Sequence, residues 1–356
     1  MAYTTIDDPS AHFQVSLWTG DGNDNRSIDQ DGNSTFQPDL IWIKSRGGTQ
    51  LHYFYDSTRG VNVQLLLNDS ATETTVADRM QAFESDGFQL GTSSEVNYVG
   101  GLAYVGWQWL ANAGSRTTNT ESGDNPGGGY QANTTAGFSI VDFTGTGGNG
   151  TMAHGLGAVP QVIMLKSRSG AHDWQMGHNS IASDAWTDYL NPNTDGAAAD
   201  NDTHWNDTAP TSTVFTLGEN AGLNGDGLTN IAYLWTPIKG FSQFGGYKGN
   251  GNTDGTFVHL GFKPAFLIIK KTSATQDWQV RDHKRDAYNE DSDELLFMST
   301  DGATTTSGNN IADFLSNGFK LRGTGGDHNE DGGTFVYLAF AEQPFVTSGG
   351  IPCTAR

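Results

Sequence analysis

Histidines and carboxylates are the side chains of this 356-residue chain best suited to acid–base or metal chemistry. His154 and His259 occupy matching places shortly before Pro160 and Pro264. A metal or acid–base site needs several such groups together, and few neighbours of either histidine along the chain supply them. A histidine at a repeated turn more commonly holds the turn with a hydrogen bond, and we expect that role for both.

A second group, confined to the middle of the chain, has the residue types of a zinc site. It consists of His172, Asp173, His178, Asp184 and His204. Zinc sites show short spacings such as HExxH or CxxC, and neither spacing occurs here. We therefore expect these side chains to serve the fold.

Two acidic turns near the N-terminus resemble fragments of a calcium-binding loop. They are Asp21-Gly-Asn-Asp-Asn25 and Asp29-Gln-Asp-Gly-Asn33. Calcium prefers such alternating oxygen ligands, but the glutamate that closes the loop at its twelfth position is absent. Asx turns produce the same clusters, so we expect solvated turns, with Ca²⁺ as the alternative. The stretches 289–294 and 328–331 have no ligand spacing and indicate plain acidic loops.

Catalytic motifs are missing from the sequence. A glycosidase needs two carboxyls across one bond, and among 40 acidic residues no pair is distinguished by its spacing. There is no GxSxG elbow, and Cys353 alone offers no plausible triad. The Gly-rich segment 145–150 lacks the Gly-Lys-Ser/Thr ending of a phosphate loop. We expect no catalytic, cofactor-binding or metal-binding residue, and a polysaccharide depolymerase is the enzymatic alternative.

Net charge and composition exclude several classes of protein. The formal charge of −21 argues against binding to nucleic acid and against docking on an anionic membrane. With one cysteine, no intrachain disulfide can form, and no apolar run approaches the length of a membrane span. The N-terminal residues show no signal-peptide pattern, so we expect synthesis in a cytosol.

The elements that position these residues recur three times along the chain. An apolar run that follows a proline and ends in a lysine occurs at Pro38–Lys44, Pro160–Lys166 and Pro264–Lys270. Runs of this length and composition predict fully buried strands, and a proline at a strand start costs no ladder hydrogen bond.

Further landmarks keep the same order around each run. A Gly-rich turn, expected to be of the hairpin type, precedes it at 18–22, 143–147 and 247–251. A Ser-Asp/Asn-Gly-Phe turn follows at 83–90 and 314–321, while the middle copy offers only 214–217. An alternating strand closes each copy at 104–109, 231–235 and 335–340. Two short helices are predicted, at 76–83 and 310–315.

The landmarks divide the chain and predict its fold class. We expect repeats at 1–115, 135–241 and 242–346, a flexible Gly/Ser/Thr/Asn-rich linker at 116–134, and a short tail at 347–356. The fold is predicted to be all-β, with three tandem β-sandwich or jelly-roll-like repeats, very little helix, and several small cores.

Aromatic residues on the closing strands allow two interpretations. They are Trp107, Trp109, Tyr233, Trp235 and Phe340. One face of an alternating strand belongs to the core. The other face either fills a core or subunit interface, which we expect, or exposes rings that stack on sugars.

Taken together, the landmarks resemble a module found in bacteriophage virion proteins. The order runs from the aromatic-led Gly turn, through His154-Gly-Leu-Gly-Ala-Val-Pro160 or His259-Leu-Gly-Phe-Lys-Pro264, to the lysine-closed strand, Asp-Trp, and the aromatic closing strand. This order is similar to the repeated module of tail-fibre-like proteins, especially those of marine phages. The first copy lacks the His-Gly-Leu-Gly element, and the second lacks Ser-Asp-Gly-Phe.

The resemblance implies a virion structural protein on the particle exterior. We expect a tail fibre or receptor-binding adhesin for host surface glycans, working through multivalent weak contacts. The alternative is a capsid decoration, head-fibre or tail-assembly protein that binds other virion proteins. A homo-oligomer is expected, with a trimer favoured.

Overall fold

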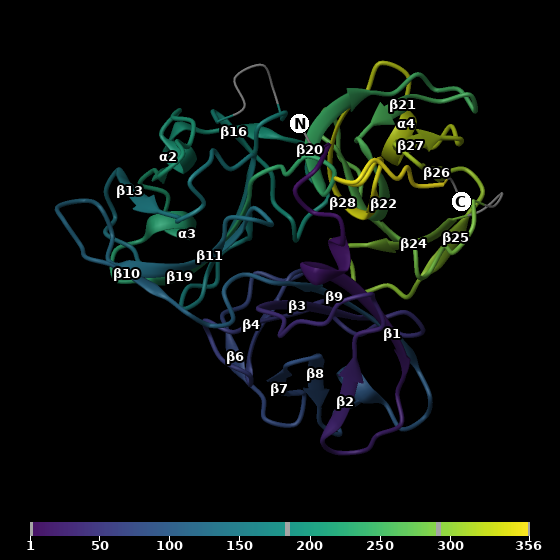
Figure 1. Ribbon diagram of the computed structural model, residues 1–356. Coiled ribbons are helices and arrows are strands. Elements are labelled where there is room, and N and C mark those ends of the chain that lie inside the picture. The colour runs from purple at the N-terminus through teal and green to yellow at the C-terminus, as the bar shows by residue number, and fades with distance from the viewer. Residues whose placement is uncertain (1–2, 182–185, 290–292, 355–356) are drawn as a thin grey trace.

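The computed structural model describes residues 3–181, 186–289 and 293–354, and within them the chain is all-β as predicted (Figure 1). Three large six-stranded antiparallel sheets dominate it, each with smaller sheets beside it. The described helices are single turns: η1 (Pro9–Ala11), α1 (Ser94–Asn97), α2 (Asp202–Trp205), α3 (Ala221–Asn224) and α4 (Gly326–Asn329). None of these helices is long and apolar enough to cross a membrane.

The first large sheet and its small partner form what we call unit 1, residues 13–109. The large sheet has the order β1 (Phe13–Thr19), β9 (Ala103–Trp109), β3 (Leu40–Ser45), β4 (Tyr53–Asp56), β5 (Val63–Leu66), β6 (Thr74–Thr75). The small sheet has the order β2 (Arg26–Asp29), β8 (Gly87–Leu90), β7 (Met80–Glu84). The first and last strands of the unit therefore pair with each other.

Unit 3, residues 242–344, has the same strand order as unit 1. Its large sheet runs β20 (Ser242–Lys248), β28 (Thr334–Pro344), β22 (Phe262–Lys271), β23 (Gln279–Asp282), β24 (Asp293–Phe297), β25 (Thr305–Ser307). Its small sheet runs β21 (Phe257–His259), β27 (Gly318–Leu321), β26 (Ala312–Leu315).

Unit 2, residues 117–235, shares the central order and adds two strands at one edge. Its large sheet runs β10 (Thr117–Asn119), β11 (Gly128–Asn133), β12 (Phe138–Thr144), β19 (Thr229–Trp235), β14 (Val162–Ser167), β15 (Gln175–His178). Its two small sheets pair β13 (Gly150–Ala153) with β18 (Val214–Leu217), and β16 (Asp188–Tyr189) with β17 (Ala199–Asp200). The segment 116–134, predicted as a flexible linker, instead carries β10 and β11, because its backbone pairs along β12.

Both short helices predicted from the sequence are wrong. Residues 80–84 and 312–315 are strands that turn back through two residues and pair with β8 and β27. A two-turn helix has little stability of its own, whereas the hairpin buries Phe88 and Phe319 completely. Gly87 allows the tight turn because its φ of +109° disfavours any residue with a Cβ.

The three large sheets pack against one shared core, which corrects the expectation of several separate cores. Trp109 contacts Trp235 of unit 2 and Phe340 of unit 3, with ring centroids 6.4 and 5.7 Å apart. A small apolar cavity of about 20 Å³ lies among side chains of all three units. The opposite face of the sheets of units 1 and 2 packs on smaller clusters under the small sheets. Burial on both faces explains why the lysine-closed runs are apolar throughout.

The Gly-rich turns lead from a large sheet to a small one and are not hairpins within one sheet. A buried asparagine at the last position of α1, α3 and α4 fixes the turn: Asn97, Asn224 and Asn329. In unit 3, Asn329 Oδ1 accepts a hydrogen bond from the backbone N–H of Asn250 at 3.0 Å. Its Nδ2 donates to the carbonyls of Asn252 and Gly323, both at 2.9 Å. The first glycine of each turn lies directly against this helix.

Adding one methyl group at Gly249 is expected to destabilise the protein. A Cβ there would lie 2.2 Å from the carbonyl oxygen of Glu330, so the turn or the helix has to shift. We expect Gly249→Ala to lower the free energy of unfolding by about 1–3 kcal/mol, measured by urea denaturation. The control is Gly302→Ala, whose Cβ meets nothing closer than 3.5 Å. Equal losses in the two variants would contradict this account of the turn.

Candidate functional site

The two histidines predicted to hold turns have different surroundings. His154 is buried and performs the expected role: its Nδ1 accepts from the N–H of Leu156, and its Nε2 lies 3.2 Å from the carbonyl of Thr211. Burial lowers the pKa of His154. His259 is exposed on β21 beside the ring of Phe257, so the turn interaction does not extend to it.

The residues considered for a zinc site serve separate purposes. His178 is buried between units 2 and 3: its Nε2 lies 3.2 Å from the carbonyl of Tyr337, and its Nδ1 accepts from Ser180. His204 stacks on Tyr189 with ring centroids 3.7 Å apart. Asp173 accepts a hydrogen bond from Asn193, His172 packs beside Gly222, and Asp184 lies outside the described residues. Among the residues that the structure describes, no three His, Cys, Asp or Glu side chains are placed to hold a metal ion.

The acidic turns near the N-terminus form local hydrogen bonds. Asp21 accepts hydrogen bonds from both the backbone and the side-chain amide of Asn23, and these bonds form the expected Asx turn. Asp21 also pairs with Arg26 at 3.4 Å. These hydrogen bonds lower the pKa of Asp21. Asp31 reaches Lys284 of unit 3 at 2.6 Å. The two turns therefore have separate partners.

The closing-strand aromatics are buried inside the chain. Their exposed fractions lie between 0% and 4% for Trp107, Trp109, Tyr233, Trp235 and Phe340. They pack at the contacts between units, so the interpretation as a sugar-stacking surface is wrong for these five rings. The expectation of burial in a core is confirmed.

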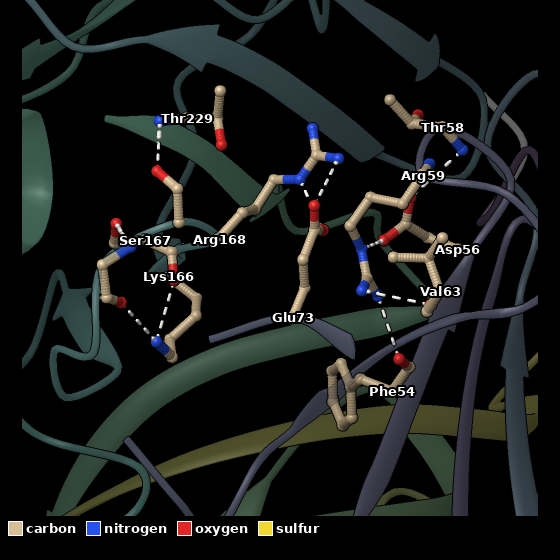
Figure 2. A network of polar contacts seen from close by, with 12 residues as sticks. Phe54, Asp56, Thr58, Arg59, Val63, Glu73, Lys166, Ser167, Arg168 and Thr229 are labelled. Carbon is tan, nitrogen blue, oxygen red and sulfur yellow. Dashed lines mark hydrogen bonds and ion pairs between the residues drawn. The ribbon is translucent and has the colours of Figure 1, made fainter. Parts of the chain in front are cut away.

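Three lysines connect the units, and they are the residues that close the apolar runs. Lys166 of unit 2 donates to the carbonyl of Ser70 in unit 1 at 3.1 Å. Within its own unit it donates to Gly170 and, as Figure 2 shows, to Ser167. Lys44 of unit 1 reaches Asp301 O in unit 3 at 3.0 Å. Burial lowers the pKa of each lysine to about 8.

The third of these contacts closes a ring. Lys270 of unit 3 donates to the carbonyl of Asp195 in unit 2 at 2.9 Å. The lysine of each unit thus binds a loop of one neighbour: unit 2 binds unit 1, unit 1 binds unit 3, and unit 3 binds unit 2. We call Lys44, Lys166 and Lys270 the lysine clasps. The sequence does show that a lysine recurs at the end of each apolar run. We interpreted that lysine only as the end of a strand and did not predict its contact with a neighbouring unit.

Two residues after each clasp lysine, a backbone carbonyl accepts a further hydrogen bond from the same neighbouring unit. The N–H of Glu73 donates to Arg168 O at 2.9 Å, and the same bond recurs twice, as Ala198 N to Thr272 O and Thr304 N to Arg46 O. Glu73 also forms a two-pronged ion pair with Arg168 (Figure 2). Contacts between units are therefore directional and specific.

Two buried ion pairs lie at the contacts between units. Asp56 pairs with Arg59, and both side chains are fully buried (Figure 2). The hydroxyl of Tyr233 in unit 2 donates to Asp56 at 2.7 Å. Asp282 and Arg285 repeat this pair in unit 3, where Trp107 of unit 1 donates to Asp282 at 3.1 Å. Burial raises the pKa of Asp282, but Arg285 outweighs it and holds the value below the usual range.

Removing one clasp is expected to weaken the contact between two units. In Lys166→Met the carbonyls of Ser70, Ser167 and Gly170 lose their donor, and unpaired buried acceptors are costly. We expect the free energy of unfolding to fall by about 1–3 kcal/mol in chemical denaturation. The control is Lys248→Met, at an exposed lysine. If both variants unfold at the wild-type denaturant concentration, the clasp contributes nothing measurable.

A groove lies between units 1 and 3, next to the N- and C-terminal segments. It contains a pocket of about 170 Å³ and a second pocket of about 270 Å³. Both pockets are lined by Asp8, Asn33, Glu342 and Gln343. Sequence reasoning missed it, because its walls come from residues more than 300 positions apart.

Comparison with known proteins gave one match. A family model described as a domain of unknown function, DUF7483, matches residues 8–344. No curated protein matches the chain. No solved structure matches it either.

Proposed function

The chain belongs to the DUF7483 family of domains of unknown function, and we propose that this member is a structural protein on the exterior of a bacteriophage particle. In this proposal it is a tail fibre or receptor-binding adhesin that contacts host surface glycans and has no enzymatic activity.

The observation that carries the proposal is the closed ring of three units. Charged, hydroxyl and aromatic groups of the interior are used for contacts between units, as in the lysine clasps and the Asp56–Arg59 pair. Segments with many buried contacts open rarely, because local opening exposes all of them. Such a body suits a part that must hold its shape outside a cell and present loops in fixed positions.

The charge of the chain supports an exterior position and a multivalent mode of binding. A net charge of −21 keeps densely arranged copies soluble and apart. Copies fixed on one particle bind with an effective concentration that raises weak single contacts to strong attachment. The groove between units 1 and 3 offers a place for such a weak contact.

A second function, decoration of the particle through protein contacts, is favoured by the two residues that follow α1 in unit 1. Tyr98 and Val99 are 41% and 74% exposed there. The equivalent positions after the single-turn helices of units 2 and 3 are Gly225-Asp226 and Glu330-Asp331. An exposed apolar pair in only one of three units suits a protein partner better than a sugar.

Binding of the purified, fluorescently labelled chain to host cells tests the proposal. We expect saturable binding that periodate oxidation of the cell-surface glycans abolishes and that protease treatment of the cells leaves intact. Binding to isolated phage heads, with none to cells, would instead establish the decoration function. Release of reducing sugar from host polysaccharide would contradict the absence of enzymatic activity.

A further inference from the structure

The groove between units 1 and 3 has an apolar floor and a polar rim. Its floor consists of Phe13 and Val15 from β1, Ala265 from β22 and Ala341 from β28. At about 170 Å³, the pocket has room for a sugar ring and not just a single water molecule.

One wall of the groove is fixed in place by hydrogen bonds. Asp8 accepts from the N–H and the hydroxyl of Ser10 and from the hydroxyl of Ser34 at 2.6 Å. Gln14 donates to the carbonyls of Ser10 and Ser34 and accepts from Gly32. Residues 31–34 are thus tied to residues 8–10. A wall fixed before binding lowers the entropy cost of holding a ligand.

The rim presents amides and carboxylates from both units. Asn33 and Gln343 are exposed, and each side-chain amide carries donors and an acceptor. Asp31 is paired with Lys284, and Glu342 accepts from Lys263 at 3.1 Å. A carboxylate has more acceptor positions than one lysine uses. Amides beside carboxylates suit the neighbouring hydroxyls of a sugar, while the floor suits its apolar C–H face.

The charge of the groove selects among sugars. Asp7, Asp8, Asp31 and Glu342 line it, with Lys284 as a basic residue of the same lining. Carboxylates near a bound sulfate or carboxylate repel it, and this repulsion discriminates between ligands of equal shape.

From these features we propose that the groove between units 1 and 3 binds a neutral saccharide. The proposal rests on the adhesive function proposed above and specifies its site and ligand class. The adjoining pocket of about 270 Å³, edged by Pro9, Pro344 and Pro352, extends the groove past the first ring. An oligosaccharide therefore fits better than a single sugar.

The test compares binding of the full chain to immobilised neutral oligosaccharides based on glucose, galactose and mannose, and to their sulfated counterparts. We expect binding to at least one neutral oligosaccharide and none to the sulfated forms. The double variant Asn33→Ala/Gln343→Ala should lower the affinity at least tenfold, because it removes both exposed amides of the rim. The control is Asn149→Ala, an exposed amide in the loop between β12 and β13 of unit 2.

The outcomes separate this inference from the proposed function. Wild-type affinity in the double variant, or preference for sulfated sugars, would overturn the groove inference and leave the adhesive function standing. Binding to host cells but to no neutral oligosaccharide would do the same. Binding to neither cells nor sugars would contradict both. Unchanged circular dichroism and unfolding midpoints of the variants ensure that loss of binding reports on the groove.

Discussion

Asp56→Ala is expected to lower the free energy of unfolding by about 3–5 kcal/mol, because it leaves a buried arginine without its counter-ion. Asp56 and Arg59 are both fully buried, and Tyr233 of unit 2 donates to the same carboxylate. Removing the carboxylate also takes the acceptor from the N–H groups of Thr58 and Arg59. The loss therefore affects unit 1 and its contact with unit 2 together.

Urea denaturation followed by tryptophan fluorescence measures this loss. The control is Asp254→Ala: this carboxylate is 83% exposed and pairs with Lys320 at 2.7 Å. Surface ion pairs contribute little, so the control should unfold at the wild-type urea concentration. If Asp56→Ala also unfolds there, the buried pair does not hold units 1 and 2 together.

His328→Leu is expected to stabilise the protein, most strongly in acid. His328 is fully buried on α4, and in the described chain neither ring nitrogen makes a hydrogen bond of good geometry. The backbone of Ile311 and Gly325 lies near the ring and offsets only part of the lowering of its pKa. The equivalent positions in units 1 and 2 are Val96 and Leu223, both fully buried, so the fold accepts an apolar residue there. An unpaired buried polar group costs about 1–3 kcal/mol, and we expect that gain at pH 7.5.

The additional gain in acid follows from proton linkage. Burial, together with nearby Arg281, lowers the pKa of His328 to about 3. Between the ordinary histidine pKa of about 6.5 and this value, the unfolded chain binds a proton that the folded chain does not. As the pH decreases through this range, the free energy of unfolding therefore decreases by about 1.4 kcal/mol per pH unit. His328→Leu has no imidazole to protonate and does not show this decrease. At pH 5 the variant should gain about 2 kcal/mol more than at pH 7.5.

Other groups titrate in the same range but cancel in the comparison. Burial lowers the pKa of His178 and His204 to about 4, which adds further loss of stability in acid. Burial raises the pKa of Asp286 to about 7, which acts in the opposite direction. All three are present in wild type and variant, so the difference between their pH curves isolates His328. Parallel curves for wild type, His328→Leu and His328→Val would contradict the account.

Much of the fold followed from local patterns in the sequence. The apolar runs ending in Lys44 and Lys166 are strands buried at every position, because a run without polar residues fits only a sheet covered on both faces. The closing strand around Trp107 was also predicted. The helix predicted at 76–83 failed because the pairing of β7 with β8 outweighs weak local helix propensity.

The arrangement of the units depends on contacts that no local pattern records. Lys44 meets Asp301, and Trp107 meets Asp282, across separations of 257 and 175 residues. The alternating pattern of the closing strand predicted that its aromatic side chains are buried, but it did not predict which residues they contact. For the same reason the groove was missed: Asn33 and Gln343 are ordinary polar residues until the ring brings them together.

The most direct test of the proposed function is labelling of intact phage particles with an antibody against this chain, viewed by electron microscopy. The account predicts label on the exterior of the particle, concentrated at tail fibres or tail tips. Label spread over the head would contradict the adhesin and favour the decoration protein. Particles without any label would contradict the proposal that the chain is part of the virion.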